Sequence, residues 1–198
     1  MRKLLIFAWL LLPGGAAAFH YYGPGHKWKE LEDVSKVIAE ADAHAAKSEW
    51  SQAVAKYDAA LQRLPADRVA QVRHIRLGKS RARMFVGQLP QAHDDLEALL
   101  QEVESDAKPD RALVQETRAA LANAQYYMTW LLRLEGLPET EWSPYIEGAR
   151  QNYRLLSEGA QEKGDPAEAK QMKEDLDSSI RLARMDLNDL QALPLPSQ

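Results

Sequence analysis

The arrangements of side chains that usually carry catalysis are missing from this sequence of 198 residues, although carboxylates are plentiful. Cysteine is absent, which excludes thiolate nucleophiles, disulfides and zinc–thiolate sites. Glycine-rich phosphate loops, His-Glu-x-x-His pairs and Gly-x-Ser-x-Gly elbows are also missing. We therefore predict a protein that is not an enzyme and that has no resident cofactor. The histidines are scattered without metal-ligand spacing: His20, His26, His44, His74 and His93.

A run of basic side chains is the first feature that could bind a ligand. No acidic residue occurs between Arg68 and Val86. Arg73, Arg76 and Arg83 recur at helical spacing and form one basic stripe. The stripe either pairs with acidic side chains of neighbouring helices, or it binds an anionic partner such as an acidic peptide or a terminal carboxylate. A nucleic-acid partner is not expected, because the formal net charge of the chain is −4.

Aromatic side chains between residues 126 and 153 are the second candidate feature. Large rings fill the space between loosely matched helices, so core packing explains most of them. Tyrosine and tryptophan also concentrate affinity at interfaces, which leaves a binding surface as the alternative. Trp142 falls in a predicted loop and is expected to be the most exposed ring. The aromatic set is Tyr126, Tyr127, Trp130, Trp142, Tyr145 and Tyr153.

The first 18 residues have the pattern of a cleaved secretory signal peptide. Arg2 and Lys3 precede an apolar run from Leu4 to Leu12, which a Pro-Gly-Gly break and three alanines follow. The apolar run is far shorter than the roughly 20 residues that a membrane-spanning helix needs. We therefore predict a periplasmic or secreted protein with no stable membrane span after processing. Without disulfides, its stability must come from packing alone.

The N-terminus left by the signal peptidase allows one minor alternative, a copper site. Cleavage after Ala17 would place His20 third from a free amine. The amine, two backbone nitrogens and the imidazole then form the square-planar set that copper(II) prefers. Cleavage after Ala18 removes this spacing.

The remainder of the chain has the pattern of an all-α protein. Apolar residues recur at helical spacing, proline and glycine separate the runs, and no stretch alternates as a strand would. Ser48 and Ser143 are the expected caps of the second and sixth helices. An irregular segment (19–26) and a tail (194–198) flank the predicted helical domain, 27–193. The seven predicted helices cover about 27–46, 49–64, 67–86, 90–104, 109–134, 144–162 and 166–193.

One stretch carries a repeat pattern. In Ala53-x3-Tyr57-x2-Ala60-Leu61-x3-Pro65 the small residues let two helices touch, the aromatic ring fills the gap, and proline ends the helix. The segment resembles the second helix of a tetratricopeptide repeat. A weaker copy follows at Ala92, Leu96 and Leu99, and a third degenerate copy combines residues 124–127 with residues 149–153. The third copy implies a long inserted loop at 136–143.

The resemblance implies antiparallel helical hairpins with a C-terminal capping helix, and a peptide-binding groove lined by the first helix of each hairpin. By that analogy, His74, Leu77, Arg81 and Met84 would face the groove. We therefore expect an exported scaffold or adaptor that binds a peptide or protein partner. The alternative is a structural accessory subunit or a self-associating helical protein. The candidate partner-binding residues are Arg73, His74, Arg76, Leu77, Arg81, Arg83, Met84 and Trp142.

Overall fold

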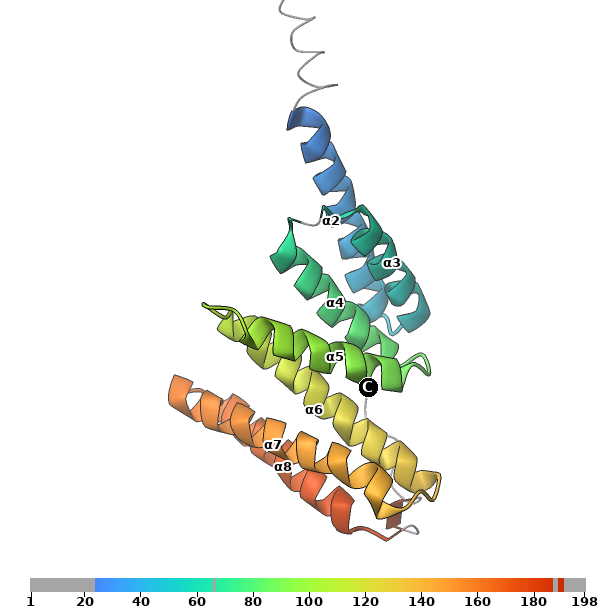
Figure 1. Ribbon diagram of the computed structural model, residues 1–198, viewed down its shortest axis with the longest axis vertical. Helices are drawn as coiled ribbons and strands as arrows, with labels where there is room; N and C mark the ends of the chain where they lie inside the picture. The colour runs from blue at the N-terminus through green and yellow to red at the C-terminus, as the bar shows by residue number, and fades with distance from the viewer. Residues whose placement is uncertain (1–23, 66, 187–188, 191–198) are drawn as a thin grey trace, which may run out of the picture. The chain divides into compact units, whose positions relative to one another are not determined.

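The computed structural model describes residues 24–65, 67–186 and 189–190, and all regular secondary structure in these ranges is α-helical (Figure 1). The predicted all-α helical-hairpin fold with about seven helices is therefore confirmed. The predicted signal peptide (1–18), the candidate copper site at its end and the tail (194–198) lie outside the described residues. The helices are α2 (Pro24–Ala46), α3 (Trp50–Arg63), α4 (Val69–Arg83), α5 (Leu89–Glu104), α6 (Arg111–Leu134), α7 (Glu139–Lys163) and α8 (Pro166–Arg184).

The chain divides into two compact units, Met1–Val72 and Arg73–Gln198. In the first unit, α2 and α3 form an antiparallel hairpin. Ala53 and Ala60 are completely buried on α3, and Tyr57 between them is 5% exposed. The Tyr57 hydroxyl donates a hydrogen bond of 2.6 Å to Oδ1 of Asp42 on α2. The small-aromatic-small spacing of the repeat pattern therefore lies at the contact between the two helices.

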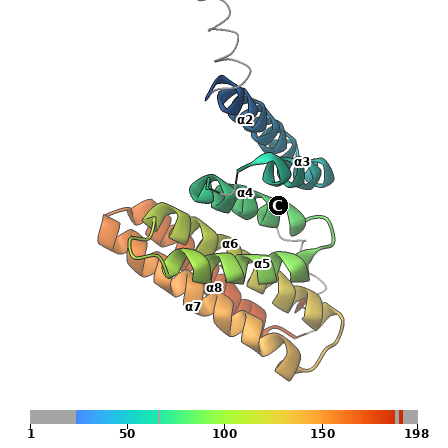
Figure 2. The ribbon, with the colours of Figure 1, turned by 45° about the horizontal axis from the view of Figure 1, so that its top comes forward.

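In the second unit, α5, α6, α7 and α8 pack one after another as antiparallel neighbours (Figures 1 and 2). Leucines of α5 and α6 fill the space between these two helices, with Leu96 and Leu99 completely buried. The contact between α6 and α7 is made by Ala122 and Ala149, which are also completely buried, with Tyr153 beside them. Alanines at these positions let the two helix backbones approach closely; Ala149 belongs to the predicted third repeat copy, whereas Ala122 does not.

Two predicted helix boundaries in the second unit are wrong. Helix α7 begins at Glu139, so Pro144 lies inside it and the predicted long loop at 136–143 is a short turn after α6. Proline lacks the N–H that would bond the Thr140 carbonyl. Because Thr140 is exposed, water can solvate that carbonyl, and the helix tolerates the proline. Helix α8 ends at Arg184, well before residue 193.

Both predicted serine caps are wrong, since Ser143 lies within α7, whose N-cap position is Pro138. Ser48 does not cap α3; it has a φ of 58° in the turn after α2, and the N-cap position is Glu49. Asp110 and Asp165 do cap their helices, since each side chain accepts hydrogen bonds from two backbone N–H groups of the first turn of α6 or α8.

Gly148 on α7 permits the close contact with α6, and Gly148→Ala is expected to destabilise the protein. A Cβ atom there would lie 2.6 Å from Nε2 of Gln125. Gln125 is 7% exposed and accepts a hydrogen bond of 3.0 Å from Asn152, so it cannot move freely. Overpacking of about 1–3 kcal/mol should exceed the roughly 1 kcal/mol that alanine gains over glycine in a helix.

Thermal unfolding followed by circular dichroism measures this effect. Gly159→Ala on the same helix is the matched control, because its Cβ would lie 3.3 Å from the end of Gln115, a side chain that can shift. A Gly148→Ala protein as stable as the Gly159→Ala protein would contradict the packing argument.

Candidate functional site

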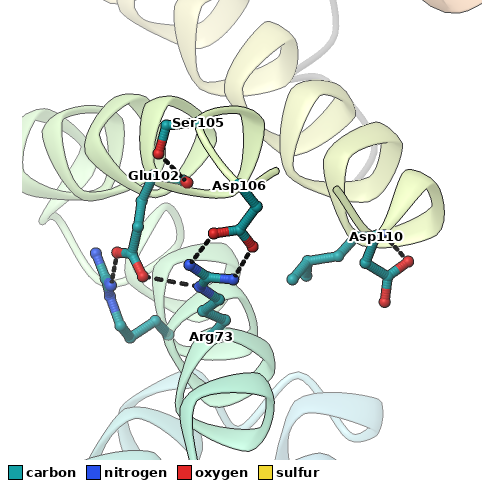
Figure 3. A network of polar contacts seen from close by, with 7 residues as sticks. Arg73, Glu102, Ser105, Asp106 and Asp110 are labelled. Carbon is teal, nitrogen blue, oxygen red and sulfur yellow. Dashed lines mark hydrogen bonds and ion pairs between the residues drawn. The ribbon is translucent and has the colours of Figure 1, made fainter. Parts of the chain in front are cut away.

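Three arginines of α4 are held by acidic side chains of α5 and the turn that follows it, and Figure 3 shows Arg73 with Glu102 and Asp106. Arg73 donates two hydrogen bonds to the Asp106 carboxylate, at 2.5 and 3.1 Å, and a third of 2.8 Å from Nε to Glu102. Arg76 binds the other oxygen of Glu102. Arg83 donates to Asp95 at 2.5 Å. Of the two interpretations of the basic stripe, pairing with neighbouring helices is the one that this geometry matches.

The electrostatics of this network follow from its hydrogen bonds. Asp106 and Glu102 raise the pKa of Arg73, and Arg73 and Arg76 in turn hold the pKa of Glu102 below its ordinary value. The pKa of Asp106 is also lowered by Arg73. The Arg73 side chain is only 14% exposed. An anionic partner would have to displace these carboxylates, so Arg73, Arg76 and Arg83 are poorly placed to bind one.

The other predicted groove residues of α4 occupy two different faces. Leu77 is 2% exposed within the core between α5 and α6, and Met84 packs against the same core. The expectation that Leu77 faces a groove is therefore wrong. Leu77 follows Arg73 by one helical turn, so both point toward α5. His74 and Arg81 are exposed, and Arg81 donates a hydrogen bond of 3.2 Å to the backbone carbonyl of Glu116.

Trp142 is not the exposed loop residue that the sequence predicted. It lies within α7, is half-buried, and packs against a core cluster with Ile146 and Leu182. The Arg133 guanidinium lies over its ring, 4.7 Å from the ring centroid. Arg133 also donates hydrogen bonds to the backbone carbonyls of Leu182 and Met185 at the end of α8. Burial lowers the pKa of Arg133. Trp142 and Arg133 therefore have a structural role.

Two half-buried tyrosines of α6 lie next to each other at the edge of the core. The rings of Tyr126 and Tyr127 meet edge to face at 5.9 Å, and Phe85 approaches Tyr127 in the same manner at 6.5 Å. Met172 and Leu176 of α8 pack against the core cluster that Tyr126 borders. Burial raises the pKa of both tyrosines. Of the remaining predicted rings, Tyr153 is buried, while Trp130 and Tyr145 are half-buried.

One acidic side chain beside these tyrosines was not predicted. Asp175 of α8 is half-buried, and burial, followed by the charge of Glu174, raises its pKa. In the sequence it stands in an acidic run that is typical of a solvated helix face. A signal was nevertheless present, because Asp175 follows Met172 by three residues and precedes Ser179 by four. Ser179 is completely buried, so Asp175 borders the apolar face of α8. We call Tyr126, Tyr127 and Asp175 the tyrosine–aspartate surface.

Within the ranges that the structure describes, no three histidine, aspartate or glutamate side chains converge as a metal site would require. None of the helices in the same ranges combines the length and the apolar character needed to cross a bilayer. Comparison with models of known protein families and with curated proteins finds no match to this chain.

Proposed function

We propose that this protein is an exported, non-enzymatic interaction module of the tetratricopeptide-like type, which binds a peptide or protein partner. The observation that carries the proposal is the pair of partly exposed tyrosines on α6, Tyr126 and Tyr127. Tyrosine supplies a large apolar contact area and a polar hydroxyl with little loss of conformational entropy, which suits it to interfaces. The exposed His74 of α4 is a secondary contact at most, and Arg81 is less suited to one because it already pairs with Glu116 at 3.5 Å.

Site-specific photo-crosslinking in the native exporting cell tests the proposal. A photoreactive phenylalanine analogue replaces Tyr127, and in the control protein it replaces Gln151, an exposed residue of α7. We expect a protein adduct of defined mass from position 127 and none from position 151. Equal labelling at both positions, or no adduct at position 127, would reject the proposal that a cellular partner binds at the aromatic surface.

The same experiment separates the proposed adaptor from the self-associating alternative. An adduct between two copies of this chain would support self-association and reject the adaptor function. Export is tested on the same material, because mass spectrometry of the purified protein shows whether residues 1–18 have been removed. Retention of Met1 would reject the exported location.

A further inference from the structure

Asp175 differs from the other carboxylates that face a neighbouring helix. Glu102 and Asp106 bind Arg73, Asp95 binds Arg83, and Glu104 binds Arg118. Asp175 has only a hydrogen bond of 3.3 Å from Gln171 on its own helix. In the part of the chain that the structure describes, no lysine or arginine lies within ion-pair distance of it. A half-buried carboxylate without a cation is energetically unfavourable, so a positively charged group of a partner would stabilise the ionised form of Asp175.

The groups around Asp175 also favour a positively charged partner group. Asp175 is adjacent to Leu176 and three residues after Met172, and both of these pack against the core cluster that Tyr126 borders, which places Asp175 near the aromatic surface of α6. Burial raises the pKa of Tyr126, Tyr127 and Tyr153, and the charge of Asp175 adds to that rise. Glu174 adds negative charge from the same helix. The charge of Arg181 opposes the rise that burial causes in the pKa of Tyr126, and Arg181 itself donates a hydrogen bond to Ser178 on its own helix. Aromatic faces attract cations, and a carboxylate beside them supplies the ion pair.

We propose that the tyrosine–aspartate surface binds a lysine or arginine side chain of a basic peptide segment in the partner. The Asp175 carboxylate accepts the hydrogen bonds of the cation, and the rings of Tyr126 and Tyr127 cover its apolar stem. A peptide fits better than a small amine because the tyrosines and Asp175 are partly exposed, so the cation is not enclosed and neighbouring contacts must add affinity. This inference rests on the proposed interaction function and reverses the charge first expected of the partner.

Binding of fluorescein-labelled hexalysine and hexaarginine, measured by fluorescence anisotropy at low salt, tests the inference. We expect Asp175→Asn to weaken binding of at least one of these peptides about tenfold or more, because it removes the charge and keeps the shape. Asp177→Asn is the matched control, since Asp177 is exposed on the same helix and should contribute no more than about twofold through general attraction. Labelled hexaglutamate should not bind.

Thermal unfolding of the same variants separates a binding role from a structural one. Because burial raises the pKa of Asp175 in the folded protein, the folded state becomes less stable as pH rises above the ordinary carboxyl pKa of 3.8. At pH 7 the Asp175→Asn protein should therefore unfold at the same temperature as the parent protein or at a higher one. A lower unfolding temperature, or equal loss of peptide binding in the Asp175→Asn and Asp177→Asn proteins, would overturn the inference.

Failure of this inference can be distinguished from failure of the proposed function. A partner crosslinked at position 127 through a segment without lysine or arginine would leave the interaction function standing and reject the cation site. Peptide binding that depends on Asp175, together with no crosslinked partner in cells, would support the cation site and reject the proposed function.

Discussion

Arg73→Ala is expected to destabilise the protein by about 1–3 kcal/mol, because it removes a largely buried charge that three hydrogen bonds hold. The loss should be smaller than for a fully buried pair, since Glu102 is 38% exposed and water can solvate it afterwards. Helix α4 should come away from α5 before the rest of the unit unfolds. Hydrogen exchange of the α4 amides, together with thermal unfolding, measures both effects.

The matched control for Arg73→Ala is Arg150→Ala. Arg150 pairs with Glu147 on the surface of α7, and an exposed pair of this kind contributes less than about 1 kcal/mol. If the two variants were equally stable, the network would be an ordinary surface feature and Arg73 would again be a candidate for partner binding.

The same network predicts the pH dependence of stability. Arginine lowers the pKa of Glu102 and Asp106 in the folded state, so their stabilising effect is present above the ordinary carboxyl range. It is lost as pH falls and the two groups take up protons. The parent protein should therefore lose more stability than the Arg73→Ala protein when the pH is lowered from neutral through the carboxyl range.

Arg133→Ala is the second substitution with a large expected effect, about 2 kcal/mol or more. It would leave the carbonyls of Leu182 and Met185 without their charged donor and uncover the ring of Trp142. The backbone amide of Leu190, a residue that is 1% exposed in the same core cluster, should then exchange its hydrogen faster. Tryptophan fluorescence and hydrogen exchange of the end of α8 report this change.

Arg133→Lys tests whether the shape of the guanidinium matters, because lysine keeps the charge but cannot reach both carbonyls in a fixed plane. We expect a stability between those of the parent and Arg133→Ala. Arg154→Ala, at an exposed i,i+4 pair on α7, is the control for loss of an arginine as such. A negligible effect of Arg133→Ala would show that α8 ends stably without this contact.

Much of the helical architecture could be predicted because it depends on local energies. Ala53, Tyr57 and Ala60 recur at the spacing of one helix face, and they do form the buried contact of the first hairpin. The last helix was predicted to begin at residue 166, and α8 does begin there, with Asp165 as its cap. The start of α7 was missed because Ser143-Pro144 is a valid local start signal that the turn after α6 overrides.

The pairing of charged side chains on different helices could not be predicted in this way. The arginines of α4 and the acidic residues of α5 were both visible in the sequence, yet Arg73 and Asp106 are 33 positions apart. Whether they meet depends on which face of α4 packs against α5. The same packing buries Leu77 and leaves His74 exposed.

Periodicity and breakers along the chain thus determined an all-α protein and the buried face of Ala53, Tyr57 and Ala60, because these follow from the spacing of residues within one helix. The partners of the charges were decided by tertiary packing, which brings together groups from helices that are distant in sequence. Packing paired the arginines of the basic stripe with carboxylates and placed Arg133 over Trp142. It also left Asp175 half-buried with no lysine or arginine of the described residues within ion-pair distance. The residue proposed to recognise a partner is therefore an acid that the sequence alone did not distinguish from its solvated neighbours.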